Sequence, residues 1–420
     1  MRVLQVNKFL YTYGGSETVM FQTSGLLEAH GHEVLYFSMH DEKNRPTAQD
    51  PYFVSNVDFS PGVQRHGSDR LKVPMIAARL VHSSEAARNI EALVKETRPD
   101  VAHLHNIYHQ LSPSILKPLR KLGVPTVMTL HDYKLICPNL MLYANGAICE
   151  RCKGGNYYEA VLQKCVKDSR MRGALCAVEA YSHRISRVYE RGVDFYIAPS
   201  LFMREKMMEF GVNAKQIAHL PNFLNLDTFT PNYEGGPYCL YAGRIERIKG
   251  IETLLKAVAK SDTASAIELR IAGDGDIRAR LEQEATEAGL DQVRFLGRVP
   301  PEDMGPLVQG ASFVVVPSEW YENAPMSILE AFAYGKPVIA ARIGGIPELV
   351  SDGENGLLFE PGNADELRQA MERLISNPAL AIQMGRRARK TIEEKYGPER
   401  HYQGLMSLYG RARDVRLPDR

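Results

Sequence analysis

The chain lacks the features that mark several large classes of protein. Its net charge is only +1, tryptophan occurs once, and aromatic residues make up 8% of its 420 residues. A nearly neutral chain has no overall positive field, so we expect no nucleic acid partner. No run reaches the roughly 18 apolar residues that a membrane-spanning helix needs, so we expect no transmembrane segment. Neither a G-x-G-x-x-G fingerprint nor a P-loop is present.

The N-terminus gives no sign of export. The opening residues MRVLQVNKFL lead directly into a strand pattern and lack the small-residue cleavage site of a signal peptide. We therefore expect a cytoplasmic protein with reduced thiols, either in solution or at the inner face of the membrane.

Strand and helix patterns alternate along the whole chain, which predicts parallel sheets covered by helices on both faces. A hydrophobic content of 44% and a charged content of 24% are ordinary for a globular protein. The expected strands are Arg2 to Val6, Glu33 to Phe37, Val101 to His105, Thr126 to Leu130, Phe195 to Ala198, Tyr238 to Ala242, Glu268 to Ala272, Arg294 to Leu296, Phe313 to Val316 and Val338 to Ala340. The expected helices of the first half are Glu17 to Ala29, Val81 to Glu96, Arg170 to Glu190 and Phe202 to Phe210.

A proline-rich and asparagine-rich segment over 219–237 is typical of a linker between two domains. We expect a first doubly wound domain over residues 1–220 and a second over residues 221–397. A last helix, about 398–413, follows the break at Tyr396-Gly397-Pro398. A helix placed after such a break is expected to cross back onto the first domain.

The stretch from Pro317 to Val350 places two carboxylates, Glu322 and Glu330, around the start of one helix. Pro325 suits the first helical position and Gly335 the end, which predicts a helix from Pro325 to Tyr334. The free N–H groups of its first turn would bind a phosphate, and carboxylates accept hydrogen bonds from sugar hydroxyls. Two glutamates at this spacing also occur by chance in ordinary helices. The buried strand pattern before Glu322 favours a ligand site, because ligands of parallel sheets bind at the carboxyl ends of strands.

A second motif, YAGRIERIKG, runs from Tyr241 to Gly250. Arg244 and Lys249 bracket a turn after a predicted strand. An arginine fork and a mobile lysine charge suit the oxygens of a diphosphate, although an isolated pair of this kind is more often a solvated basic turn. Its place in the same predicted domain as Glu322 favours diphosphate binding.

Strand ends in the predicted first domain carry two further candidates. Gly14-Gly15 follows the first strand and would let a loop approach a ligand closely. His131-Asp132 follows the strand VPTVMTL and would face the cleft between the domains. A lone histidine is more often structural, so this residue is open between the two roles. Gly344-Gly345 opens a short helix and is a candidate second cradle for the donor.

Four cysteines form a C-x11-C-x2-C-x12-C pattern in a glycine-rich stretch. Such a grouping around C-x-x-C suits a structural zinc site. Reduced thiols, two disulfides and an iron–sulfur cluster are alternatives. The residues concerned are Cys137, Cys149, Cys152 and Cys165.

The predicted helix from Arg170 to Glu190 combines several arginines with an apolar set. Such a helix can meet anionic lipid headgroups, which would make the protein peripheral to a membrane. Its glutamates, Glu179 and Glu190, favour an ordinary solvated helix instead.

Taken together, these segments resemble retaining glycosyltransferase family four (glycosyl transferases group 1). The resemblance is strongest over residues 238–361, where YAGRIERIKG, the paired glutamates and GGIPELV occur in the family's order, and it extends more thinly to Gly14-Gly15 and His131-Asp132. It implies an α/β GT-B fold, with two doubly wound Rossmann-like domains facing a cleft. These motifs are specific for the family but not for a donor or an acceptor, and the cysteine cluster is no part of its common core.

The resemblance also implies roles for residues of this chain. Glu322 would contact the donor sugar near its reacting carbon and His131 the transferred sugar, so these two are the expected catalytic residues. Gly14 and Gly15 would approach the diphosphate or the acceptor. Arg244 and Lys249 would hold the diphosphate with the amides of the Pro325 helix, and Glu330 the ribose. The full donor-binding set implied is Gly243, Arg244, Lys249, Arg298, Val299, Ala324, Pro325, Met326, Ser327 and Glu330.

The function implied is transfer of a sugar, with retention, from a UDP- or GDP-linked donor to an acceptor hydroxyl in bacterial polysaccharide or glycoconjugate synthesis. The acceptor is a sugar, a lipid-linked molecule or a small molecule, and no catalytic metal is expected. A sugar-nucleotide epimerase of the same fold and a non-enzymatic binding or redox-sensing module are the alternatives.

Overall fold

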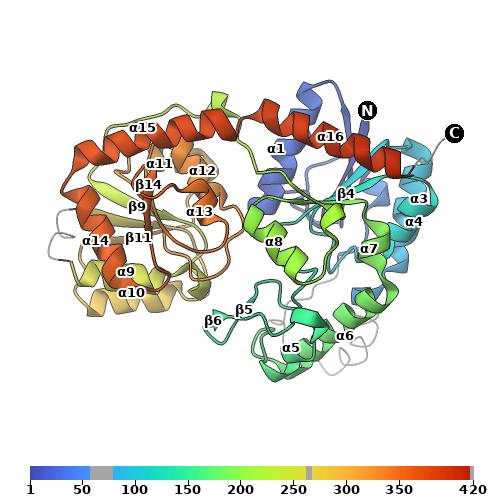
Figure 1. Ribbon diagram of the computed structural model, residues 1–420, viewed down its shortest axis with the longest axis horizontal. Coiled ribbons are helices and arrows are strands. Elements are labelled where there is room, and N and C mark those ends of the chain that lie inside the picture. Colours follow the sequence, from blue (N-terminus) through green and yellow to red (C-terminus); the bar gives the residue numbers. More distant parts are fainter. Residues whose placement is uncertain (57–78, 262–266, 417–420) are drawn as a thin grey trace.

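The computed structural model describes residues 1–56, 79–261 and 267–416, which build two α/β units side by side (Figure 1). Each unit holds a six-stranded parallel sheet with helices on both faces. Most central strands are buried throughout, as expected for parallel strands covered on two sides. The predicted fold class is confirmed.

The first sheet has the strand order β2-β1-β3-β4-β7-β8. Its strands are β1 (Arg2–Val6), β2 (Glu33–Phe37), β3 (Val101–Leu104), β4 (Thr126–Thr129), β7 (Phe195–Ala198) and β8 (Ile217–His219). The helices around it are α1 (Gly15–Ala29), α3 (Ser84–Thr97), α4 (Leu116–Lys121), α7 (Val188–Gly192) and α8 (Leu201–Glu209). The sequence patterns missed β8, which has only three residues and ends where the predicted linker begins.

The second sheet has the order β11-β10-β9-β12-β13-β14, with a crossover beside β9 where ligands of open sheets bind. Its strands are β9 (Tyr238–Ala242), β10 (Glu268–Ala272), β11 (Val293–Gly297), β12 (Val314–Val316), β13 (Val338–Ala341) and β14 (Gly356–Phe359). Its helices are α9 (Ile251–Ala259), α10 (Arg278–Glu287), α11 (Pro301–Gln309), α12 (Met326–Ala333), α13 (Ile346–Leu349), α14 (Ala364–Ile375) and α15 (Pro378–Lys395).

The last helix, α16 (Pro398–Arg416), leaves the second unit and packs on the first (Figure 1). Its Leu405 and Tyr409 join the core formed under the first sheet. The Tyr409 hydroxyl lies 2.7 Å from Nδ1 of the buried His103, and Arg416 pairs with Asp194 at 2.6 Å. The predicted crossing back of this helix is therefore confirmed.

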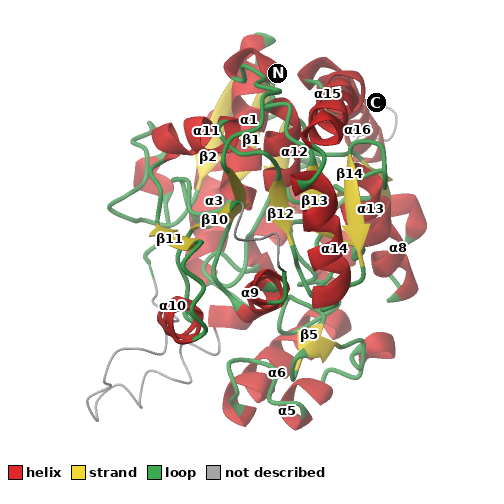
Figure 2. Ribbon diagram, turned by 90° about the vertical axis from the view of Figure 1, so that its left-hand side faces the viewer, coloured by secondary structure: helices red, strands yellow, loops and turns green. Residues whose placement is uncertain are grey.

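A smaller excursion between β4 and β7 stands apart from both sheets, at the lower end of Figures 1 and 2. It contains β5 (Tyr143–Ala144), β6 (Ala147–Ile148), α5 (Glu159–Leu162) and α6 (Arg170–Ser186). The predicted helix from Arg170 to Glu190 is broken, because Arg187 takes the left-handed conformation between α6 and α7. Among the described helices, none is both long enough and apolar enough to span a bilayer.

Candidate functional site

A cleft of about 410 Å³ lies between the two units, at the carboxyl ends of their strands. Both β4 and β12 end at it, and so do the turns that follow β1 and β9. From the first unit it is lined by Gly15, Ser16, Val19, Asn106, His131, Asp132 and Pro199. From the second unit and the connection to it come Asn222, Tyr241, Ala242, Gly243, Arg244, Lys249, Val316, Ser318, Trp320, Glu322, Asn323, Ala324, Pro325, Met326 and Ser327.

The cleft brings together most of the residues that the sequence motifs predict for it. His131 of the first unit faces the same space as Glu322, Arg244 and Lys249 of the second. Gly14, Glu330, Arg298 and Val299 are not among its lining residues. Their predicted roles are therefore untested by the shape of the cleft.

Glu322 is held by an ion pair. Its Oε1 lies 2.6 Å from Nζ of Lys249 and accepts a hydrogen bond of 2.7 Å from the Ser318 hydroxyl. The Glu322 side chain is 7% exposed and that of Lys249 is 18% exposed. Burial pushes the pKa of Glu322 up, but Lys249 and the hydrogen bonds outweigh it and hold the pKa below its ordinary value. Glu322 is therefore ionised, and its carboxylate is held in one orientation.

The helix behind this loop begins one residue later than the sequence predicts. Pro325 is the N-cap of α12 in an extended conformation, and Met326 is the first helical residue. No side chain caps this end. The N–H groups of Met326 and Ser327 therefore face the cleft at the positive end of the helix dipole.

Arg244 reaches the cleft from the turn after β9. Its side chain is 62% exposed and, among the described residues, pairs only with Glu246 of the same turn, at 2.7 Å. An exposed pair of this kind contributes little free energy. The guanidinium can therefore exchange Glu246 for a stronger anion.

Glu330 lies on α12, one turn beyond Met326, and is partly buried. The structure gives its carboxylate no hydrogen bond or ion pair among the described residues. Burial alone raises the pKa of Glu330 to about 7. A carboxylate in this state gains from any ligand that donates hydrogen bonds to it.

His131 ends a row of hydrogen-bonded side chains in the first unit. Its Nε2 lies 2.9 Å from Nδ1 of His105, and Nε2 of His105 lies 2.9 Å from Oε1 of Gln5. Burial lowers the pKa of His131 to about 4, so this imidazole is neutral near pH 7. With Gln5 accepting from His105, and His105 from His131, Nδ1 of His131 is left as an acceptor for a sugar hydroxyl.

The GGIPELV motif serves as a contact between the two units rather than as a second cradle. Both carboxylate oxygens of Glu348 accept hydrogen bonds from the first N–H groups of α8, at 2.7 and 2.8 Å. Asn323 adds bonds to the Ser200 hydroxyl and the Leu130 carbonyl, each 2.9 Å long. Sequence patterns missed Asn323, Ser318 and Glu348, since single polar residues in loops and in the four-residue helix α13 carry no periodic signal.

Gly344 is expected to be indispensable for the position of Glu322. It has φ +61, and a Cβ there would lie 2.2 Å from the Glu322 carbonyl oxygen. Gly344→Ala should lower both the melting temperature and catalytic activity. Gly353→Ala is the matched control, because Gly353 has φ +77 and no atom within 4 Å of its Cβ position. Both variants carry the left-handed strain of about 1–2 kcal/mol, so equal activity in the two would contradict this role of Gly344.

The four clustered cysteines are free thiols, as are Cys176 and Cys239. Burial raises the pKa of Cys165 to about 12 and also raises the pKa values of Cys137 and Cys152, so these thiols keep their protons. The Cys137 thiol donates to Oδ1 of Asn139 at 2.8 Å. Within residues 1–56, 79–261 and 267–416, no three Cys, His, Asp or Glu side chains are grouped to hold a metal ion. The predicted structural zinc at Cys137, Cys149, Cys152 and Cys165 gains no support from this arrangement, and the disulfide alternative is not what the structure contains.

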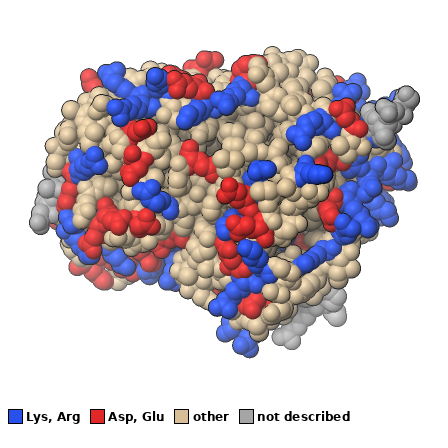
Figure 3. Space-filling model, in the orientation of Figure 1, with Lys and Arg blue, Asp and Glu red and all other residues tan. Residues whose placement is uncertain are grey.

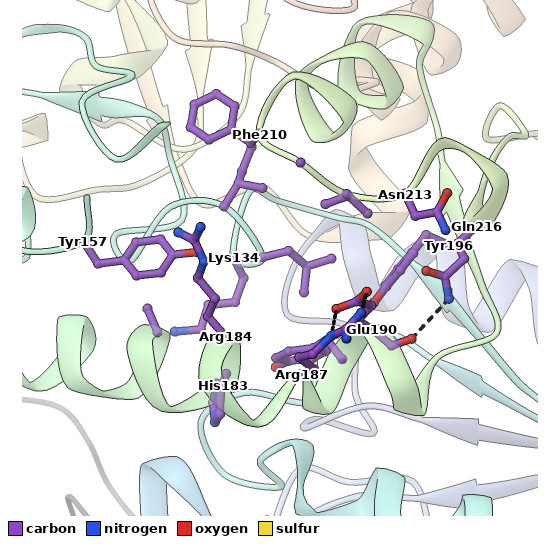
Figure 4. A pocket seen from close by; sticks show the side chains of 16 residues that line it. Lys134, Tyr157, His183, Arg184, Arg187, Glu190, Tyr196, Phe210, Asn213 and Gln216 are labelled. Carbon is purple, nitrogen blue, oxygen red and sulfur yellow. Dashed lines mark hydrogen bonds and ion pairs between the residues drawn. The ribbon is translucent and has the colours of Figure 1, made fainter. Parts of the chain in front are cut away.

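A second cavity, of about 250 Å³, lies under α6 and α7 (Figure 4). Its cations already have partners: Lys134 pairs with Glu179 at 2.7 Å, and Arg187 pairs with Glu190. Arg184 donates to the Gly154 carbonyl at 2.7 Å. An anionic ligand would have to break these contacts, so the cleft is the better candidate site.

Two facing parallel α/β units, a cleft at their strand ends and a final helix that crosses back define the GT-B class of protein. The sequence model of Glycosyltransferase Family 4 matches residues 13–228, and that of glycosyl transferases group 1 matches residues 225–391. The chain belongs to Glycosyltransferase Family 4.

Curated relatives support the same assignment. A D-inositol 3-phosphate glycosyltransferase of Pseudarthrobacter chlorophenolicus is 27% identical over 399 residues, covering 89% of this chain and 85% of the relative. The D-rhamnosyltransferase WbpZ of Pseudomonas aeruginosa is 37% identical over 156 residues, 37% of this chain and 40% of the relative. An uncharacterised glycosyltransferase of Methanocaldococcus jannaschii is 32% identical over 179 residues, 42% and 49% of the two chains. The last two matches thus span half or less of each relative's length.

Solved structures agree with the fold. Sucrose-phosphate synthase from Thermosynechococcus elongatus superposes with a TM-score of 0.71 at 22% identity, over 97% of this chain and 98% of the other. Anabaena HepE, solved in complex with UDP and glucose, superposes with a TM-score of 0.68 at 17% identity, over 98% and 99%. At these identities the likeness shows the fold alone.

Proposed function

We propose that the protein is a glycosyltransferase that moves a sugar from a nucleoside diphosphate sugar to an acceptor hydroxyl with retention of configuration. The observation that carries this proposal is that one cleft holds both cationic groups, which suit the diphosphate of a donor, and hydrogen-bond acceptors, which suit its sugar. Arg244, Lys249 and the open N-terminus of α12 offer positive charge for a diphosphate. Glu322 and His131 offer acceptors for sugar hydroxyls beside it.

The ribose site follows from α12. Glu330 has no partner among the described residues, and it lies one turn behind the N–H groups proposed to hold the diphosphate. A ribose diol would donate two hydrogen bonds to its carboxylate. We place the base farther out, toward Arg298 and Val299 after β11, and the Gly14-Gly15 turn next to the diphosphate or the acceptor.

In the proposed reaction, the bond between the sugar C1 and the diphosphate oxygen breaks and its electron pair goes to the diphosphate. Arg244, Lys249 and the N–H groups of α12 stabilise that charge as it develops. The acceptor oxygen bonds to C1 on the face that the diphosphate leaves, and the acceptor proton passes to the departing phosphate oxygen. The proposal thus places the charge stabilisation in protein groups rather than in a catalytic metal.

The two units divide the work in this proposal. Residues 221–397 hold the donor, while residues 1–220, with the final helix, receive the acceptor. Because Asn323 of the second unit bonds to Ser200 and Leu130 of the first, this proposal expects donor binding to be coupled to contact between the units. The same proposal includes a UDP- or GDP-linked sugar as the donor and bacterial polysaccharide or glycoconjugate synthesis as the pathway.

Donor binding is expected to raise the melting temperature. A panel of UDP-glucose, UDP-galactose and GDP-mannose should single out one base, and a donor at a hundred times its Kd stabilises by about 2.7 kcal/mol. Arg244→Ala should abolish that shift. Arg342→Ala is the matched control, since Arg342 is an exposed arginine of the same unit that pairs with Asp352 outside the cleft.

Transfer itself is then measured with the selected donor and a set of sugar and lipid-linked acceptors, with NMR of the product anomer. A product of inverted configuration would contradict the proposed retention. Conversion of the donor to an epimer without any acceptor would favour the epimerase alternative. Binding without turnover of any kind would favour a sensor.

A further inference from the structure

Helix α6 carries an apolar stripe that the rest of the described chain does not cover. Met171, Val178 and Ile185 are seven residues apart and therefore lie on one side of the helix. Their side chains are 67%, 59% and 81% exposed. The opposite side of α6, with Gly173, packs so closely on α5 that a Cβ there would lie 2.4 Å from a backbone oxygen. Within the part of the chain that the structure describes, the stripe is thus an outer surface, and the inner face of the helix is used for packing.

The charges of this region are nearly all of one sign. Glu179, the acidic residue that favours a solvated helix at the level of sequence, points inward instead: its side chain is 1% exposed and pairs with Lys134. Glu190 forms an ion pair with Arg187. The exposed cations before and along α6 and α7 are Lys164, Lys167, Arg170, Arg184, Arg187 and Arg191, of which Arg187 pairs with Glu190. In residues 162–191 the exposed acids are Asp168 and the paired Glu190.

The positive surface continues onto the neighbouring helix. Arg120 of α4 donates to the Arg191 carbonyl of α7 at 3.0 Å, which places the two helices side by side. Lys117, Arg120 and Lys121 of α4 are exposed. Figure 3 shows the result: blue side chains gather on the right-hand side of the molecule, where α3, α4 and α7 lie in Figure 1.

We propose that α6 is a membrane-docking surface, which lies in the headgroup region of an anionic bilayer with Met171, Val178 and Ile185 directed toward the acyl chains. A bilayer fits these observations because it offers hydrocarbon and a continuous negative charge in one plane. A protein partner would need acidic residues at several separate positions to match the same cations. The long aliphatic stems of lysine and arginine allow their charges to stay at headgroup level while the stripe descends between them.

The docking surface is separate from the cleft, so this inference stands whether or not the proposed reaction is correct. It lies on the unit that carries His131, the side proposed for the acceptor. If that proposal also holds, docking would bring a lipid-linked acceptor to the correct half of the cleft. The failure of one idea leaves the other intact, because vesicle binding is measured without donor or acceptor.

The test is co-sedimentation of the full chain with vesicles of equal parts phosphatidylglycerol and phosphatidylcholine, and with vesicles of phosphatidylcholine alone. We expect binding to the anionic vesicles that weakens as salt is raised. The triple variant Met171→Ser, Val178→Ser, Ile185→Ser should bind at least about tenfold more weakly. The matched control is Leu296→Ser with Val415→Ser, which removes exposed apolar side chains elsewhere.

A second variant tests the charges without touching the stripe. Lys167→Gln with Arg170→Gln should weaken binding about fivefold for each cation removed, and its salt dependence should become shallower. All the substituted residues are exposed, so melting temperatures close to wild type are expected. Equal binding of wild type and triple variant would overturn the proposal. So would a dimer in solution that the triple variant loses, because the stripe would then be an interface between two copies of the chain.

Discussion

Replacing Lys249 with methionine is expected to lower glycosyl transfer about a hundred- to a thousandfold, the usual loss when one group that stabilises transition-state charge is removed. The lysine ammonium lies 2.6 Å from Glu322 and lines the cleft beside Arg244. In the proposed reaction the lysine orients Glu322 and neutralises the charge of the departing diphosphate. The fall should appear mainly in kcat, measured with the donor selected by thermal shift.

The same substitution should destabilise the protein, which the sequence alone does not predict. Removing the cation leaves Glu322 as a buried charge with only hydrogen bonds, a situation that costs about 3–5 kcal/mol. In the wild type the lowered pKa of Glu322 means that the pair stabilises the fold above the ordinary carboxyl range and loses this contribution as pH falls through the folded pKa. Without Lys249, burial alone raises the pKa. The melting temperature of Lys249→Met, relative to wild type, should therefore fall as pH rises from 5 to 8.

The double variant Lys249→Met, Glu322→Gln separates the two effects. With both charges gone, the melting temperature should recover most of the loss, while transfer stays abolished. Lys260→Met is a control for loss of a lysine in the same unit, because Lys260 pairs with Asp365 on the surface. A wild-type rate of transfer by Lys249→Met would contradict the proposed position of the diphosphate beside this lysine.

These expectations show what the sequence could and could not predict. Strand and helix periodicity, with Pro325 and Gly335 as punctuation, locates α12 to within one residue. Strand ends then place Arg244, Lys249 and His131 at one edge of the sheets, because parallel strands share a direction. The ion pair between Lys249 and Glu322 spans 73 residues and depends on how two loops pack, which no local pattern records.

The same limit explains the interpretations that the structure changes. Gly344-Gly345 reads as a ligand cradle because glycine allows close approach, but the atoms that approach are the backbone of Glu322 and Asn323. Glu179 reads as a solvent-facing residue, yet its carboxylate faces a buried lysine from another loop. In both cases the residue type was informative, but the sequence did not reveal which residue it contacts. Contacts between residues that are distant in the sequence become known only from the three-dimensional structure.

Glu330→Gln is expected to produce opposite changes in stability and donor binding. Burial raises the pKa of Glu330 to about 7 in the folded protein. The folded state therefore binds a proton more tightly than the unfolded chain, and this residue lowers stability as pH rises from about 4.5 to 7. Glutamine carries no charge, so the variant should match wild type near pH 4 and exceed it at pH 8, by roughly 1–3 kcal/mol.

Donor binding should change in the other direction. A ribose diol donates to the ionised carboxylate, so wild-type affinity for the donor should rise with pH up to about 7 and then level off. Glu330→Gln should bind the donor more weakly at pH 8 and with little dependence on pH. Calorimetric titration with the selected donor at several pH values measures both. A variant that gains stability and keeps full, pH-dependent affinity would show that Glu330 is only a buried carboxylate of α12, and the ribose would then have to lie elsewhere in the cleft.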